Sequence, residues 1–220
     1  MTSRLLFLAV ALSLSLPGFA RAEFSYDLLQ MGFQQNRIGV DELDTDLRSD
    51  GVLLVYAREF SPAWFVYNSL NAGTLENSVR MQNYDLHFNG TLISANAGIG
   101  RHWALADNAD IHLKDGLAHS RYDLKMRATD ISSEAQIQSR ESDDDTGLHL
   151  EAGSRIYLNS SRSLEFNPYI GLTSLRGDTD THTGFCLGLQ TAPRIQLQWI
   201  FDQSTDNELQ SFGMAVRVSL

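Results

Sequence analysis

The last strand of the chain most constrains what it can fold into. From Leu209 to Leu220 the residues alternate in character, and side chains point to alternate faces of a strand, so the segment has one apolar and one polar face. A membrane β-barrel needs such a closing strand, because an unpaired sheet edge is not tolerated in lipid. A strand of a soluble β-sandwich would show the same pattern. The apolar face carries Phe212, Met214, Val216, Val218 and Leu220.

The first 22 residues have the pattern of a secretory signal peptide. Arg4 precedes an apolar run from Leu5 to Leu16, and Ala20-Arg21-Ala22 forms a cleavage site of small residues. The run is too short for a transmembrane helix, which needs about 20 residues. We therefore expect a leader at 1–22 and one domain at 23–220.

The charge and the cysteine content exclude several classes of protein. Loss of Arg4 and Arg21 with the leader would change the net charge from −10 to about −12, and nucleic-acid binding instead requires basic patches. The only cysteine, Cys186, cannot form an internal disulfide. The sequence has no phosphate loop, Ser-His-Asp pattern or Cys/His metal motif, so we expect no cofactor and no metal.

The chain after residue 22 is predicted to be all-β, with little helical periodicity. Longer and more acidic connections alternate with short turns, which is typical of outer-membrane barrels. We predict a single antiparallel up-and-down transmembrane β-barrel of about ten strands, or of eight if two pairs of segments are single bent strands. The expected strands are 24–36, 50–60, 63–72, 84–104, 110–126, 146–158, 164–176, 183–192, 194–202 and 209–220. The expected long connections are 37–49, 73–83, 127–145, 177–182 and 203–208.

Polar residues on the inner face of these strands predict a charged lumen. They either fill the barrel with salt bridges, as in narrow barrels, or line a selective pore. Lys114 joins them if its strand keeps register, and Cys186 is expected there as a small filler. Asp115 would then face lipid, so we expect a β-bulge or register change beside it. The predicted lumen network is His149, Glu151, Arg155, Glu165 and Arg217.

Four segments resemble the small outer-membrane β-barrels of Gram-negative bacteria, of the porin-like and OmpX/OmpA type. The resemblance covers nearly all of the chain after the leader and implies an outer-membrane location without a reaction. Leu220 departs from that pattern, because such barrels usually end in an aromatic residue that the assembly machinery reads. The segments are 24–33, 95–100, 143–155 and 211–219.

Asp178, Asp180 and His182 are the sharpest candidates for chemistry. In an extended segment they share one side, where they could activate water, as in an omptin-like protease, or bind a divalent cation. A solvated acidic loop is the simpler interpretation. The acidic runs at 41–46 and 143–145 are likewise expected to be solvated, or to share divalent cations with lipopolysaccharide.

The favoured function is a non-enzymatic porin-like or structural barrel with acidic external loops. The alternatives are the hydrolase that would use His182 and a soluble periplasmic ligand-binding barrel. Expected partners are outer-membrane lipid and lipopolysaccharide, and the barrel assembly machinery through residues 209–220. We expect a monomer that binds no nucleic acid.

Overall fold

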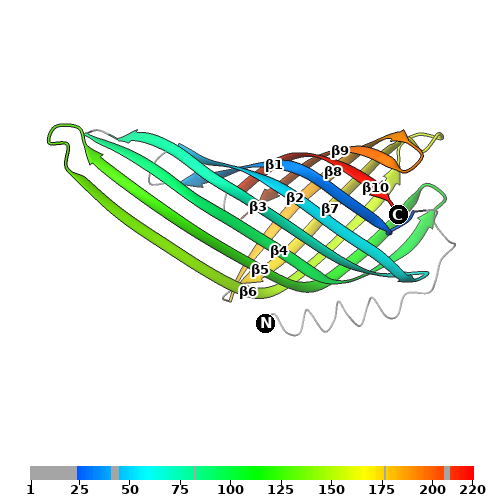
Figure 1. Cartoon of the computed structure of the whole chain (residues 1–220). Coiled ribbons are helices and arrows are strands. Elements are labelled where there is room, and N and C mark those ends of the chain that lie inside the picture. The colour runs from blue at the N-terminus through cyan, green and yellow to red at the C-terminus, as the bar shows by residue number, and fades with distance from the viewer. Residues whose placement is uncertain (1–23, 41–44, 82, 176, 206–208) are drawn as a thin grey trace.

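The computed structural model describes residues 24–40, 45–81, 83–175, 177–205 and 209–220, which form a closed barrel of ten antiparallel strands (Figure 1). Each strand pairs with its neighbours in sequence, and β10 pairs with β1. The predicted fold class and count of ten are confirmed, and the eight-strand and sandwich alternatives are wrong. The strands are β1 Leu28–Val40, β2 Thr45–Ser61, β3 Trp64–Met81, β4 Tyr84–Ala106, β5 Ala109–Asp130, β6 Gln136–Tyr157, β7 Leu164–Leu175, β8 Asp178–Ala192, β9 Ile195–Ser204 and β10 Leu209–Ser219.

The predicted leader at 1–22 and most of the acidic run 41–46 lie outside the described residues. Within the described part, no helix is long and apolar enough to cross a membrane.

The terminal strand closes the barrel with the two faces that its alternation predicts. β10 pairs with β1 from Leu28 opposite Ser219 to Ile38 opposite Leu209. Phe212 and Met214 are 56% and 50% exposed on the outside, whereas Ser211 and Arg217 are buried inside. The outer surfaces of the other strands also expose apolar side chains, including Phe33, Leu117 and Ile170. An apolar outside around a polar interior suits a bilayer and argues against the soluble periplasmic alternative.

Several segments expected to be loops are instead strands. The predicted connections 73–83 and 127–145 mostly continue β3 to β6, which are 18 to 23 residues long. A membrane-spanning strand needs only about 9–11 residues, so these strands extend well beyond the lipid. Their hairpins project furthest in Figure 1, at the end opposite the C-terminus. We call this extension the β-arm, formed by residues 73–81, 84–92, 119–130 and 136–147.

An apolar cluster explains why the β-arm stays folded outside the membrane. Leu75 and Phe88 of the β-arm are buried together with Leu47 of β2, and partly buried residues pack against them. The alternation of β3 to β5 thus continues past the lipid, with mostly apolar side chains inside and polar ones outside. Polar outer residues made these segments resemble loops in the sequence. The packed residues are Ile38, Val79, Leu86, Leu124 and Met126.

The bulge expected at Asp115 does not form. β5 pairs continuously with β6, and Asp115 lies between Ile99 of β4 and Leu150 of β6. Register shifts occur instead near the short turns, for example between Ala104 and Ala106. Asp115 therefore lies on the outward face with Leu117. The strand keeps its regular backbone pairing although this places one charged side chain on the outside of the barrel.

Glycines on the inner face make room for large side chains from neighbouring strands. A Cβ atom at Gly100 of β4 would lie 2.1 Å from Cζ of Phe65, which is fully buried. A Cβ atom at Gly171 of β7 would lie 2.0 Å from Nε2 of His182. The lumen is thus filled by side chains that lie across the adjacent strand.

Candidate functional site: the barrel lumen

A buried ion cluster crosses the lumen near the end with the short turns. Glu165 of β7 is fully buried and accepts hydrogen bonds from Arg155 of β6 and Arg217 of β10. Arg155 Nε lies 3.0 Å from Oε1 and Arg217 Nη1 lies 2.9 Å from the same oxygen. Gln196 Nε2 donates to Oε2 at 3.2 Å, and Gln198 donates to Gln196 in turn. Because β7 and β10 are three positions apart in the barrel, this cluster connects strands that do not pair with each other.

An aromatic layer lies against the ion cluster. The ring of Tyr26 stacks on Phe65 and on His102 with centroid distances of 4.4 and 4.5 Å. The guanidinium of Arg155 lies 5.0 Å from the Tyr26 ring, which is a cation–π contact. The Tyr26 hydroxyl donates to Asp110 at 3.1 Å and lies 3.3 Å from Nδ1 of His112. The side chains of Phe24 and Tyr26 are therefore buried in the lumen ahead of β1.

Glu151 of β6 is the centre of a second network. Its Oε1 accepts from Nζ of Lys114 at 2.7 Å and lies 3.4 Å from Nε2 of His112. Its Oε2 faces Nε2 of His149 at 3.8 Å. The His149 ring is stacked on His182 of β8, with a centroid distance of 5.6 Å and an interplanar angle of 5°. Two histidines and one carboxylate therefore converge on the same wall.

The predicted lumen residues lie inside the barrel in two groups. Arg155, Glu165 and Arg217 form the ion cluster, whereas His149 and Glu151 belong to the second network. Lys114 joins Glu151, as continuous register allows. Cys186 is a free, partly buried thiol on the inner face beside Asn167.

The predicted Asp178, Asp180 and His182 lie in β8 rather than in a loop. Their register partners in β7 are Leu175, Thr173 and Gly171. Asp180 accepts a hydrogen bond from Ser204 at 2.7 Å, while His182 stacks on His149. The structure thus groups His182 with β6 residues, and Asp178 remains exposed at the end of its strand.

Sequence reasoning did not place Tyr26 or His102 in the lumen network. Tyr26 precedes the first strand, and its burial and its contacts with Phe65, His102 and Asp110 show that it points inward. His102 lies in an almost entirely buried stretch of β4, where alternation gives no clear face. Asp110 and His112 of β5 both contact the Tyr26 hydroxyl, and alternation within β5 could not identify that partner.

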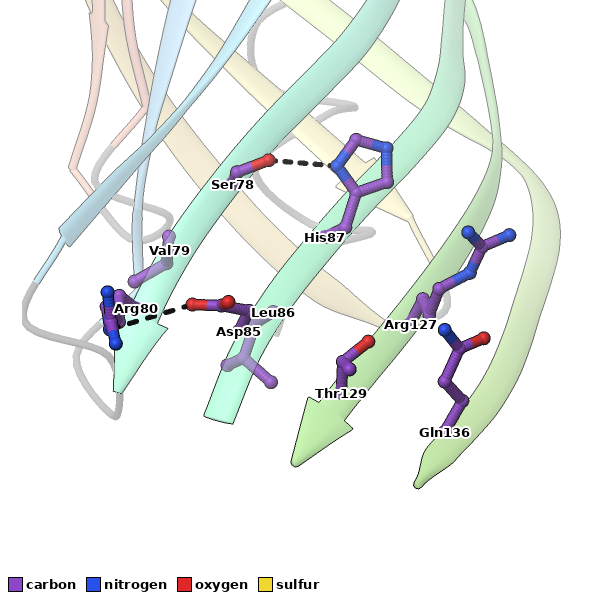
Figure 2. Close-up of a pocket in the computed structure, with 9 residues that line it drawn as sticks. All are labelled: Ser78, Val79, Arg80, Asp85, Leu86, His87, Arg127, Thr129 and Gln136. Carbon is purple, nitrogen blue, oxygen red and sulfur yellow. Dashed lines mark hydrogen bonds and ion pairs between the residues drawn. The ribbon is translucent and has the colours of Figure 1, made fainter. Parts of the chain in front are cut away.

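A groove on the outside of the β-arm is a second candidate site (Figure 2). There Ser78 bonds Nδ1 of His87 at 2.9 Å and Arg80 lies 3.8 Å from Asp85. Further along β5, Arg121, Lys125 and Arg127 also point outward and are exposed. The outward face of the β-arm is therefore rich in cations, although the whole chain is acidic. The groove is lined by Ser78, Val79, Arg80, Asp85, Leu86, His87, Arg127, Thr129 and Gln136.

The acidic residues of the β-arm are distributed differently. Glu141, Asp143 and Asp145 of β6 alternate on the face that points to the barrel axis, and Glu141 accepts from the Tyr122 hydroxyl at 2.8 Å. The run 143–145 is therefore part of a strand rather than a solvated loop, and only Asp144 of the three points outward. The inward face of β6 is therefore acidic, whereas the outward face of the β-arm carries cations together with Asp85, Asp123 and Asp144.

Comparison with known proteins supports the architecture. No protein-family model matches the chain, and no curated protein matches it. Among solved structures, the translocator domain of the autotransporter NalP from Neisseria meningitidis is similar with a TM-score of 0.59 and 10% identity, over 99% of this chain and 94% of that one.

Two further barrels are similar at lower TM-scores. The outer membrane protease OmpT from Escherichia coli has a TM-score of 0.48 and 8% identity, over 90% of this chain and 98% of that one. The outer membrane protein OprG from Pseudomonas aeruginosa has a TM-score of 0.45 and 12% identity, over 92% of this chain and 100% of that one. At such identities the likeness to NalP establishes the fold alone. The closed sheet, the apolar outer surface and this shared fold identify the chain as an outer-membrane β-barrel.

Proposed function

We propose that this protein is a non-enzymatic outer-membrane barrel with a closed lumen and a structural role. The ion cluster of Arg155, Glu165 and Arg217 carries the proposal, because it joins the non-adjacent strands β7 and β10 inside the lumen and is itself buried. The aromatic layer of Tyr26, Phe65 and His102 lies next to it. A solute crossing the barrel would have to displace both layers and leave buried charges unpaired, at a cost of several kcal/mol.

Conductance in planar bilayers tests the closed lumen. We expect the purified barrel to give no steady ion current. The variant Glu165→Ala combined with Arg217→Ala removes the bridge between β7 and β10, so it should conduct. The matched control Glu141→Ala changes an exposed β-arm carboxylate and should remain closed. A steady current through the unchanged protein would refute the proposal and favour a pore.

The absence of enzymatic activity is tested separately. The hydrolase alternative would use Asp180 and His182, yet Asp180 is bonded to Ser204 and His182 lies against Gly171 inside the barrel. We expect the folded barrel to cleave no peptide from a mixed substrate library. Cleavage that disappears in both Asp180→Ala and His182→Ala would contradict this part of the proposal.

We further propose that lipopolysaccharide binds the outward face of the β-arm. Arg121, Lys125 and Arg127 project there from β5, just beyond the apolar surface, where phosphates of the outer leaflet lie. Asp123 between them is already held by a bidentate contact from Arg140, at 2.9 and 2.5 Å. The β5 cations therefore leave net positive charge for an anionic lipid.

Binding of purified lipopolysaccharide to the folded barrel in detergent tests this partner. Lys125→Gln combined with Arg127→Gln should weaken binding severalfold and reduce its dependence on salt. Arg194→Gln, at the opposite end of the barrel, is the matched control and should bind normally. An equal loss in the control, or no loss in the double variant, would refute the contact. Recognition of residues 209–220 by the assembly machinery and the monomeric state stay predictions.

A further inference from the structure

We propose that the lumen contains a binding site for a divalent transition-metal ion, with Zn²⁺ as the preferred occupant. Its ligands are His149 and Glu151 of β6 and His182 of β8. One ligand atom from each lies within 4.8 Å of the other two. This spacing lets a single ion contact all three after small side-chain movements, since Zn–N and Zn–O bonds are about 2.0–2.2 Å.

The β-sheet register explains how residues from two non-adjacent strands meet. Gly171 of β7 pairs with Glu151 on one side and with His182 on the other. A Cβ atom at Gly171 would lie 2.0 Å from Nε2 of His182. The imidazole therefore lies across β7 through the space that this glycine leaves, and so reaches the β6 residues.

Neighbouring groups already hold the ligands by their other atoms. Oε1 of Glu151 is bound by Lys114 at 2.7 Å, which leaves Oε2 facing His149. Nδ1 of His149 lies 3.2 Å from the Thr173 hydroxyl, which leaves Nε2 facing the carboxylate. Such outer-shell contacts orient ligands in metal sites and set the tautomer of a histidine. Here they direct one free atom of each β6 ligand toward the same point.

The donor set selects the class of ion. Two imidazoles and one carboxylate suit Zn²⁺ and similar transition metals, whereas Ca²⁺ and Mg²⁺ prefer oxygen ligands throughout. Asp180, two residues before His182, and Asp202, which pairs with Gly184, add negative charge on the same inner face. This charge favours a dication despite the ammonium of Lys114. The site does not depend on whether the lumen conducts.

Calorimetric titration of the full barrel, folded in detergent, with Zn²⁺ tests the site. We expect one ion per barrel, and loss of binding in His149→Ala and in His182→Ala. Gly171→Ala keeps every ligand but displaces the His182 ring, so it should weaken binding by roughly 10- to 100-fold, as outer-shell changes do. His119→Ala is the matched control, because His119 lies on the outward face and contacts Thr146.

Titration with Co²⁺ supplies a second readout, because its visible absorption reports the coordination number and geometry of the bound ion. Heat-dependent gel mobility identifies folded variants, and His182→Gln replaces His182→Ala if the latter does not fold. The proposal is overturned if the unchanged barrel binds no Zn²⁺. It is equally overturned if folded His149 and His182 variants bind as well as the unchanged protein, or if His119→Ala abolishes binding.

Discussion

Replacement of Glu165 by glutamine is the most informative test of how this barrel is held together. The carboxylate is fully buried and accepts hydrogen bonds from Arg155, Arg217 and Gln196. Glutamine has nearly the same size and still accepts through its carbonyl oxygen. The substitution therefore removes the negative charge while it leaves the packing of the lumen almost unchanged.

The expected loss follows from the two cations that remain. Arg155 and Arg217 are only 5% and 7% exposed, so neither can regain its hydration without opening the barrel. Breaking a buried ion pair by removing one partner typically costs about 3–5 kcal/mol, because a buried charge is left uncompensated. We expect Glu165→Gln to lower the free energy of unfolding by about that amount.

Urea unfolding in lipid vesicles, followed by tryptophan fluorescence, measures this free energy. Glu141→Gln removes an exposed carboxylate of the same type and should change it by about 0.5 kcal/mol or less. Adding Arg217→Met to Glu165→Gln removes one unpaired cation and should recover part of the loss. If Glu165→Gln is no more destabilising than Glu141→Gln, the ion cluster does not stabilise the barrel.

Three further predictions concern single positions. Asp115→Leu should stabilise the barrel in vesicles by up to about 2 kcal/mol, because it removes a charge from the outward face, and destabilisation would instead indicate a partner there. Gly100→Ala should cost about 1–3 kcal/mol in the same assay, since its Cβ atom would meet the Phe65 ring, and an unchanged midpoint would contradict that packing. At the tip of the β5–β6 hairpin, hydrogen bonds from the hydroxyl and backbone of Ser132 hold the pKa of Asp130 below its usual range. They therefore stabilise the tip above the usual pKa of aspartate and are lost as the pH falls through the lowered pKa, so Ser132→Ala should raise the NMR titration midpoint of Asp130.

Much of the fold could be predicted because side chains along each strand alternate between the lumen and the outside. The alternation of β10 indicated which residues face outward, and the short turns marked the ends of the strands. The β-arm was mistaken for loops because its outer residues are as polar as those of a loop. Its inner residues Leu75, Phe88 and Met126 keep the alternation, but weakly enough that only the sheet pairing makes it evident.

The grouping inside the lumen could be predicted only in part. Inward-facing charges follow from alternation within one strand, whereas their partners depend on the register between strands. His182 was associated with Asp178 and Asp180, its neighbours in sequence, yet the gap at Gly171 directs it toward Glu151. Such a contact requires three strands to be aligned at once, which a single sequence does not specify.

The unequal lengths of β6 and β7 have a consequence for solubility. Pairing between them begins at Leu148 opposite Ser174, so among the described residues the stretch 136–147 of β6 has no β7 partner. Outside the membrane this stretch exposes a backbone that could template a strand from another molecule. Glu141 and the run Asp143-Asp144-Asp145 lie along it, and a second copy arriving at this edge would bring the same carboxylates into register. Because these like charges would repel each other, the acidic run opposes edge-to-edge association between copies of the barrel.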